Sequence, residues 1–175
     1  FMRSILLFPY VGPVVALAYT WELLLDPYSG TLNNLLLNFQ VIQEPLNLLG
    51  QKYLTINFFG FDLKLRLALT TVIIFEIWRY FPLAFLFILA RLQAVPKELY
   101  EAADVDGAGP LQKFISITLP QIMAVISILF MIRFIWNFNK FEDIFLLTGG
   151  ASGTRTLPIN VYEQGFTISD IGMGS

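Results

Sequence analysis

The stretch 96-PKELYEAADVDGAGPLQKFISITLP-120 is the most polar and charge-dense part of a chain that is otherwise apolar almost from end to end. Its opening proline suits the first turn of a helix, where the missing N–H costs nothing. Glu98 and Glu101 lie in the early turns, where the helix dipole favours negative charge. Gly107 is well placed to end the helix in a left-handed conformation. We therefore predict a helix over 97–106, which at about ten residues is too short to be stable alone in water.

This helix has one small, shallow face bordered by acidic residues. The face and its borders consist of Leu99, Ala102, Ala103 and Asp106, with Glu98, Glu101 and Asp104 around them. A second short helix is predicted from Pro110, and four of its residues are expected to pack it back before Pro120 opens the next apolar run: Leu111, Phe114, Ile115 and Thr118. Such a pair of helices fits either a docking element for another protein or an amphipathic connector on a membrane surface, and the spacing alone leaves both open.

The rest of the chain has the composition of a membrane protein. Of its 175 residues, 56% are hydrophobic and 14% are charged, whereas soluble domains carry about a quarter charged residues. Three apolar runs reach the roughly 20 residues that a crossing helix needs: 4–25, 65–92 and 120–147. We therefore predict an all-α, polytopic membrane helical bundle in which these crossings are separated by loops 26–64 and 93–119 and followed by loop 148–175.

Several function classes are disfavoured by what the chain lacks. It has no cysteine and no histidine, which removes thiol nucleophiles, disulfides, histidine bases and the commonest zinc and haem ligands. It has no G-x-x-x-x-G-K-[ST] sequence for nucleotide phosphates, and its net charge of −2 gives no basic footprint for nucleic acid. We expect a chain that is not an enzyme and holds no metal or cofactor. Because it starts at Phe1 and shows no signal peptide, we also expect it to be a piece of a longer polypeptide.

The loop 26–64 contains two predicted local structures. Asp26-Pro27 and Ser29-Gly30 mark a turn, after which Thr31 is expected to cap a short amphipathic helix. The β-rich piece at 56–61 is expected to lie in an interfacial loop. Lysines and arginines number four on one side of the predicted crossings and five on the other, so charge bias does not fix the orientation.

Two charged residues, Glu76 and Arg79, lie one turn apart within the second crossing. A charge in the middle of a membrane costs on the order of 3 kcal/mol, so two must be paired or face a wet cavity. We predict an intramembrane ion pair that holds the crossing against its neighbours, in preference to direct contact with a solute.

Polar and aromatic side chains gather where the third apolar run becomes polar. Asparagine amides can bind sugar hydroxyls and an indole can cover the C–H face of a sugar ring. The candidate solute-pathway residues there are Arg133, Trp136, Asn137 and Asn139, and Trp78 and Tyr80 of the second run are included with them. An interfacial aromatic belt with helix-packing amides explains the same residues equally well.

For residues 96–120, a sequence motif decides between the docking element and the membrane-surface connector. The string 101-EAADVDGAG-109, followed by 117-ITLP-120, resembles the EAA loop of the permease subunits of binding-protein-dependent ABC importers. Stretches 9–33, 78–103 and 138–166 are similar to the sugar-importer branch, and 147-LTGG-150 is most similar to the maltose-type first permease of a heterodimeric pair. The resemblance covers nearly the whole chain apart from roughly 39–63.

The resemblance implies a topology and a role for the polar stretch. It implies six or more crossings per subunit, so that further crossings lie outside this sequence. It implies that 93–119 faces the cytoplasm and that 26–64 and 148–175 are external, in a bacterial or archaeal plasma membrane. The helix at 97–106 then resembles the coupling helix that binds a groove of the ATPase subunit, with Glu101 as the acidic contact rather than only a favourable first-turn charge. The coupling residues carried over by the motif are Glu98, Glu101, Ala102, Ala103, Asp106 and Gly107.

The resemblance also implies partners and a class of solute. The partners are a second, similar permease, a cytoplasmic ATPase dimer that binds the ATP and Mg²⁺, an extracytoplasmic solute-binding protein, and membrane lipid. The expected solute is a sugar, an oligosaccharide or a related polyol. Two alternatives are an importer of another solute, such as a polyamine or a glycerophosphate, and an ion-coupled secondary transporter in which Glu76 and Arg79 carry the coupling.

Overall fold

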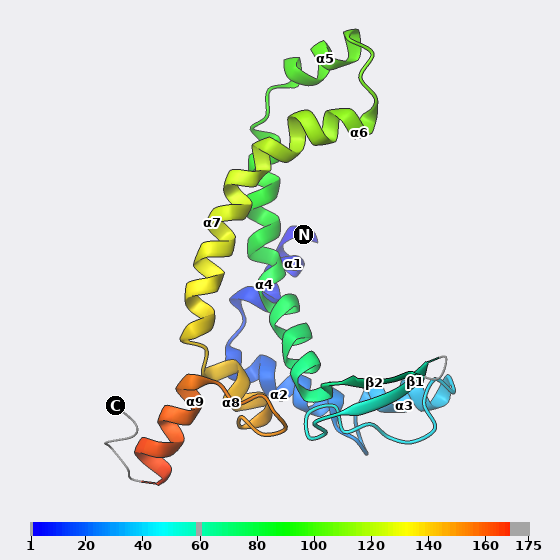
Figure 1. The fold of residues 1–175 in the computed structure, drawn as a ribbon, viewed down its shortest axis with the longest axis vertical. Coiled ribbons are helices and arrows are strands. Elements are labelled where there is room, and N and C mark those ends of the chain that lie inside the picture. The colour runs from blue at the N-terminus through cyan, green and yellow to red at the C-terminus, as the bar shows by residue number, and fades with distance from the viewer. Residues whose placement is uncertain (1, 59–60, 169–175) are drawn as a thin grey trace. The chain divides into compact units, whose positions relative to one another are not determined.

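The computed structural model describes residues 2–58 and 61–168, and helices dominate them (Figure 1). The elements are α1 (Met2–Val11), α2 (Val14–Leu25), α3 (Thr31–Asn38), β1 (Leu54–Phe58), β2 (Phe61–Leu65), α4 (Leu67–Gln93), α5 (Lys97–Val105), α6 (Pro110–Lys113), the π-helix η1 (Phe114–Thr118), α7 (Leu119–Phe138), α8 (Glu142–Thr148), α9 (Leu157–Tyr162) and the π-helix η2 (Glu163–Thr167). The predicted all-α class is confirmed, with one β-hairpin added. Part of the predicted external loop, 169–175, lies outside the described residues.

The chain divides into two compact units. Unit 1 comprises Phe1–Tyr10 and Tyr80–Asn137, and unit 2 comprises Val11–Arg79 and Phe138–Ser175. The long helix α4 contributes its second half to unit 1 and its first half to unit 2.

Within the described residues, two helices are long and apolar enough to cross a membrane: Leu67–Gln93 and the continuous helix Pro110–Phe138. In their most apolar windows only 17% and 6% of the residues are buried by this chain. A core helix of a soluble protein would be mostly buried, so these apolar surfaces require lipid or other protein segments around them. The second predicted crossing, 65–92, thus coincides with a helix of suitable length and composition, and its passage through the membrane stays a prediction.

The third predicted crossing has different boundaries from those expected. The helix begins at Pro110, because α6, η1 and α7 run on without a break, and it ends at Phe138. Pro120 was expected to open a new helix, because a proline ring inside a helix clashes with the carbonyl four residues earlier. Here the residue four positions before Pro120 lies within the π-helical turn η1. The wider turn accommodates the proline. The two short helices predicted over 97–119 are thus one short helix and the first turns of a long one.

The first predicted crossing, 4–25, is divided between two helices. α1 ends at Val11 and α2 begins at Val14, because Gly12 precedes a proline and is biased away from helical dihedrals. Pro13 adopts an extended conformation with φ −57° and ψ 127°. Neither helix alone has the length of a crossing, so the statement that 4–25 crosses the membrane stays a prediction.

The core of unit 2 is formed by apolar side chains from α2, α4, α8 and α9. Its buried members are Leu17, Ala18, Val72, Phe75, Ile144, Leu147 and Ile159. The Trp21 ring packs edge-on against that of Phe75, with centroids 5.3 Å apart. This packing fixes α2 and α8 against the first half of α4.

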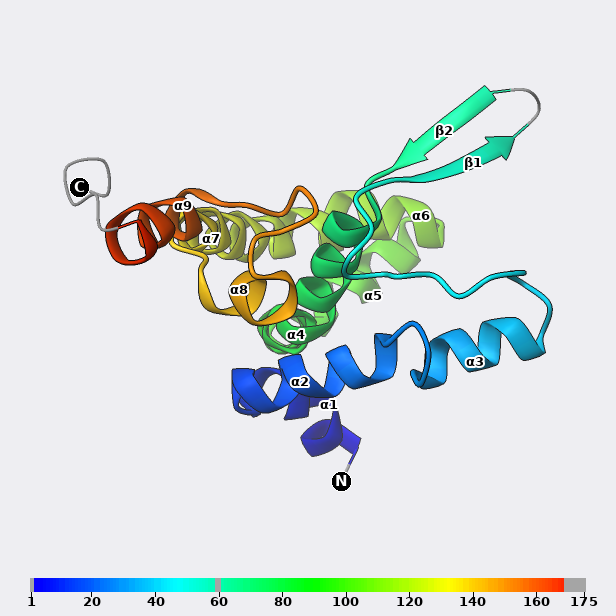
Figure 2. The same cartoon turned by 90° about the horizontal axis from the view of Figure 1, so that it is seen from below.

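Unit 2 also contains α3 and the hairpin, which extend as separate arms in Figure 2. The strands are antiparallel, with register from Leu54 opposite Leu65 to Phe58 opposite Phe61. Gly30, not Thr31, is the N-cap of α3, and Thr31 is its first helical residue. The two-residue connection of the hairpin lies outside the described residues.

Candidate functional site

The helix α5 in the polar stretch has well-defined ends. Pro96 is its N-cap, and Gly107 follows its C-cap with φ +71°. The N–H of Ala108 donates to the carbonyl of Ala103 at 2.9 Å, and that of Gly107 donates to Asp104 at 3.1 Å. These bonds form a Schellman ending, which requires a left-handed residue at the position of the glycine. The prediction that Gly107 terminates this helix is confirmed.

Two side-chain contacts hold α5 against the helix that follows it. The Tyr100 and Thr118 hydroxyls are hydrogen-bonded at 2.8 Å, and Lys113 forms an ion pair with Asp104. Four residues were expected to pack the second helix against α5, and of these Thr118 contacts α5. The other three, Leu111, Phe114 and Ile115, are exposed, because the helix from Pro110 turns a polar side toward α5. Neither contact was predicted from the sequence, although Tyr100 is amphipathic and Asp104 is of opposite charge to Lys113.

The opposite side of α5 is exposed and mixes acidic with apolar residues. None of the residues of α5 is buried. Its exposed predicted coupling residues are Glu98, Glu101, Ala102 and Asp106, while Ala103 is half-buried. Val105 was not predicted as a contact and is 89% exposed, and Leu99 is also exposed. Exposed apolar side chains rimmed by acids are typical of a surface that binds another protein.

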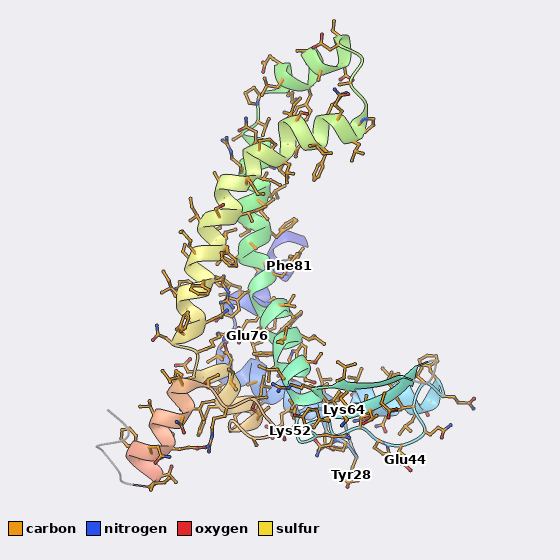
Figure 3. All side chains as sticks on the ribbon, in the orientation of Figure 1. Tyr28, Glu44, Lys52, Lys64, Glu76 and Phe81 are labelled. Carbon is orange, nitrogen blue, oxygen red and sulfur yellow. The ribbon has the colours of Figure 1, made fainter. Side chains whose placement is uncertain are left out.

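Four charged side chains form a cluster in unit 2. Arg79 pairs with Asp143, and Lys140 pairs with Asp143 and lies 3.2 Å from a carboxylate oxygen of Glu76. Each of these side chains is less than one-fifth exposed. Both Glu76 and Arg79 thus take part in ion pairs that reach from α4 to the start of α8, and the predicted pairing of Glu76 with Arg79 themselves stays a prediction. Figure 3 shows Glu76 on α4. Glu76 and Arg79 lie on one face of α4, where Glu76 meets Lys140 and Arg79 meets Asp143.

The predicted solute-pathway residues fall in both units. Tyr80, Arg133, Trp136 and Asn137 belong to unit 1, whereas Trp78 and Asn139 belong to unit 2. In unit 1 the guanidinium carbon of Arg133 lies 3.6 Å from the centre of the Tyr80 ring, a cation–π contact.

The remaining pathway candidates differ in their surroundings. In unit 2, Trp78 packs on Trp21 with ring centroids 5.5 Å apart, so part of its surface serves packing. Trp136, Asn137 and Asn139 are exposed. Trp21 was not singled out from the sequence, although an aromatic residue in an apolar helix is a signal for packing.

Comparison with known proteins gives a family match over almost the whole chain. Residues 1–172 match the family described as "Binding-protein-dependent transport system inner membrane component". The inner membrane ABC transporter permease protein YcjO of Escherichia coli is 36% identical over 170 residues, which cover 97% of this chain and 53% of that protein. The trehalose/maltose transport system permease protein MalF of Thermococcus litoralis is 34% identical over 175 residues, which cover 99% of this chain and 54% of that protein.

A third relative belongs to a system for a different solute. The sn-glycerol-3-phosphate transport system permease protein UgpA of Yersinia pseudotuberculosis is 32% identical over 173 residues, which cover 97% of this chain and 53% of that protein. The chain thus spans about half the length of the curated relatives it matches.

Solved structures give the same fold. A chain of a bacterial ABC transporter involved in the import of the acidic polysaccharide alginate matches with a TM-score of 0.70 and 21% identity, covering 99% of this chain and 56% of that one. The same coverage and TM-score, at 22% identity, are found for the alginate transporter in complex with an alginate pentasaccharide-bound periplasmic protein. At this identity the match establishes the fold of the present chain.

Proposed function

This chain belongs to the family of binding-protein-dependent transport system inner membrane components, and we propose that it forms part of the translocation pathway of an ATP-driven importer for a sugar or oligosaccharide. It is a membrane protein, and in this proposal the two long apolar helices, Leu67–Gln93 and Pro110–Phe138, cross the membrane.

The observation that carries the proposal is the exposed face of α5, which is attached through short links to the two long apolar helices. A partner that moves α5 must therefore move the ends of α4 and of the helix Pro110–Phe138. The Schellman ending and the Tyr100–Thr118 hydrogen bond stiffen this connection. Rigid-body motion of short elements is how closure of one domain is transmitted to another.

The energy source in this proposal is a separate ATPase dimer, which binds the ATP and Mg²⁺. The acidic residues of α5, Glu98, Glu101 and Asp106, favour a basic or hydrogen-bond-donating groove on that partner. A second permease completes the pathway, and an extracytoplasmic solute-binding protein delivers the solute. The solute-binding protein is supported by the periplasmic protein in the structurally similar alginate transporter complex.

A sugar is favoured as the solute by the exposed Trp136 and Asn137 in the last turn of the second long helix. They supply an amide for hydroxyl groups and a flat apolar surface for a sugar ring. The trehalose/maltose permease among the relatives supports the same class. A glycerophosphate is the second candidate, because Arg133 supplies a cation for a phosphate and a glycerol-3-phosphate permease is also similar.

The test is uptake of labelled solute by proteoliposomes that contain the full-length protein with its partners. We expect Glu101→Arg to abolish uptake and association of the ATPase while the protein stays in the membrane. Glu22→Arg is the matched control, because Glu22 is also an exposed acid but lies on α2, and it should retain both.

Two outcomes would contradict the proposal. Full transport by Glu101→Arg would show that α5 is not the coupling element, and uptake that needs no ATP and collapses with an ionophore would indicate a secondary transporter. Competition by maltose or trehalose, compared with glycerol 3-phosphate, separates the two solute classes.

A further inference from the structure

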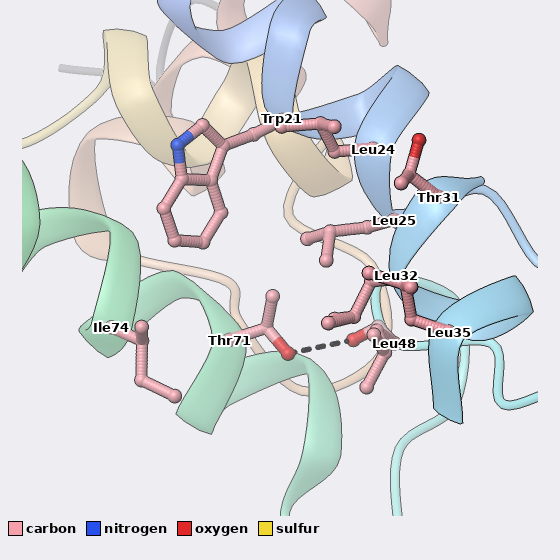
Figure 4. Close-up of a pocket in the computed structure, with 9 residues that line it drawn as sticks. All are labelled: Trp21, Leu24, Leu25, Thr31, Leu32, Leu35, Leu48, Thr71 and Ile74. Carbon is pink, nitrogen blue, oxygen red and sulfur yellow. Dashed lines mark hydrogen bonds between the residues drawn. The ribbon is translucent and has the colours of Figure 1, made fainter. Parts of the chain in front are cut away.

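Unit 2 contains an apolar pocket of about 380 Å³ between α2, α3 and the first turns of α4 (Figure 4). This volume lies in the range of about 300–1,000 Å³ that is typical of small-molecule sites. The lining residues are Trp21, Leu24, Leu25, Thr31, Leu32, Leu35, Leu48, Thr71 and Ile74. Because nearly all of the lining is apolar, the pocket suits a hydrocarbon and not a sugar.

One polar group of the lining, the Thr71 hydroxyl, already forms hydrogen bonds within the protein. The Thr71 hydroxyl lies 3.1 Å from the carbonyl oxygen of Leu48 and 3.0 Å from that of Leu67, so its single hydrogen is taken by the backbone. Figure 4 shows the bond to Leu48 at the edge of the pocket. Sites for polar ligands place a few convergent polar groups to orient them. This pocket instead offers dispersion contacts.

The mouth of the pocket is formed by apolar side chains that this chain leaves partly uncovered. Leu24, Leu32, Leu35 and Ile74 are between 38% and 52% exposed. Exposed apolar side chains gathered around an apolar cavity are unfavourable in water. They are favourable where the surrounding medium is hydrocarbon.

This inference rests on the crossing of the membrane by α4 in the proposed function, and with that crossing the position of the pocket along α4 places it at the edge of the membrane. At 1.5 Å per residue, the 27 residues of α4 span about 40 Å, whereas the hydrocarbon core is about 30 Å thick. When the helix is centred, about 5 Å at each end lies in the interface. Thr71 and Ile74 are about 6 and 10 Å from the start at Leu67, so the pocket opens where the hydrocarbon begins.

We propose that this pocket binds one acyl chain of a membrane lipid. The lipid would fill the space between α2, α3 and α4 and would brace the amphipathic helix α3 against the core of unit 2. The proposal concerns a site distinct from the solute pathway and does not depend on which solute is transported. It also gives a reason for the exposed leucines of α3, which a loop surrounded only by water would not retain.

Trp21 allows the pocket to be tested directly, because its indole is part of the lining. The full-length protein in its complex is placed in bilayers of phosphatidylcholine brominated on the acyl chain, since bromine quenches tryptophan fluorescence on contact. The fluorescence of a Trp21→Phe variant is subtracted to isolate the signal of Trp21. We expect this signal to fall at least twofold relative to unbrominated lipid.

Variants in which larger side chains fill the pocket distinguish a bound acyl chain from ordinary contact of Trp21 with the bilayer. Leu32→Phe combined with Leu35→Phe adds bulk from the α3 wall, and Ile74→Phe adds it from the α4 wall in case the first variant does not fold. Either should restore most of the Trp21 signal. Leu23→Phe is the control, because Leu23 is on the same helix as Trp21, is 72% exposed and does not line the pocket.

Two results would overturn the proposal. A Trp21 signal that bromine does not quench would show that the pocket is dry or is covered by another protein segment. Equal quenching in the filled variants would show that Trp21 meets bulk lipid without a chain bound in the pocket. A bound chain should also remain with the purified complex and be lost from the filled variants, as measured by mass spectrometry of extracted lipid.

Discussion

The guanidinium of Arg79 pairs with the carboxylate of Asp143, which follows 64 residues later in the chain and is 1% exposed. This pair joins the first half of α4 to the first turn of α8. Removal of one partner from a buried ion pair leaves the other charge uncompensated, which costs about 3–5 kcal/mol. We expect Asp143→Asn to destabilise unit 2 by an amount of this order, measured by unfolding of the purified protein in detergent.

The matched control for this prediction is Glu142→Gln. Glu142 is also an acid in the first turn of α8, but it is exposed. It should therefore change the unfolding free energy by no more than about 0.5 kcal/mol, as is usual for surface substitutions. If the two variants were equally stable, the pair would be a surface contact of no structural weight.

The ending of α5 gives a second prediction. Gly107 has φ +71°, and a Cβ added there would meet nothing within 4 Å. Gly107→Ala should therefore destabilise this turn only through the backbone conformation, by roughly 1–2 kcal/mol for an alanine in the left-handed region. We expect looser coupling, seen as a lower ratio of solute transported to ATP hydrolysed.

Gly109 provides the comparison for Gly107. It is equally open to a Cβ, but its φ is −71°, which any residue can adopt. Gly109→Ala should therefore leave the coupling ratio unchanged. A loss of coupling in both variants would point to crowding by the partner at this turn and not to backbone geometry.

A third prediction concerns Asn33, whose side chain is fully buried. Its amide donates to the carbonyls of Asp26 and Leu46 at 3.2 and 3.0 Å, and it accepts the N–H of Leu46 at 3.0 Å. Asn33→Ala leaves these buried backbone groups without partners, at a cost of about 1–3 kcal/mol. We expect faster amide exchange at Leu46, whereas Asn34→Ala, at the exposed neighbouring position, should leave it unchanged.

The local features of this fold were predictable where one residue decides them. Gly107 ends α5 because the backbone there requires a left-handed residue, and the run 65–92 forms α4 because its length and composition suit a crossing. The break at Pro13 was missed when 4–25 was taken as one crossing, although glycine followed by proline punctuates a helix. The unbroken passage through Pro120 was not, because it depends on the π-helical turn.

The candidate site was predictable only in part. The sequence motif located α5 and its acidic residues. It did not reveal which face of α5 packs against the rest of the chain. That depends on Tyr100 meeting Thr118 and on Asp104 meeting Lys113. The spacing of Glu76 and Arg79 suggested only a partner within the same helix, and it could not reveal the ion pairs that both residues form with Lys140 and Asp143.

The last prediction follows from the turn after α2, where the carboxylate of Asp26 accepts three hydrogen bonds. The donors are the N–H and hydroxyl of Ser29, at 2.7 and 2.9 Å, and the N–H of Tyr28, at 3.0 Å. The Ser29 N–H and hydroxyl, followed by the Tyr28 N–H, lower the pKa of Asp26 below its ordinary value of 3.8. A pKa lowered by folding stabilises the folded turn above the unfolded value, and this stabilisation is lost as the pH falls below 3.8.

We therefore expect the Tyr28 and Ser29 amides to lose protection from exchange below pH 3.8, after correction for intrinsic exchange rates. Asp26→Asn keeps an oxygen acceptor but cannot titrate, so its protection should not depend on pH in this range. Ser29→Ala removes one donor and should move the loss of protection to higher pH, because the pKa of Asp26 is then lowered less. The same acid profile in the wild type and in Asp26→Asn would assign the change to other carboxylates and not to this turn.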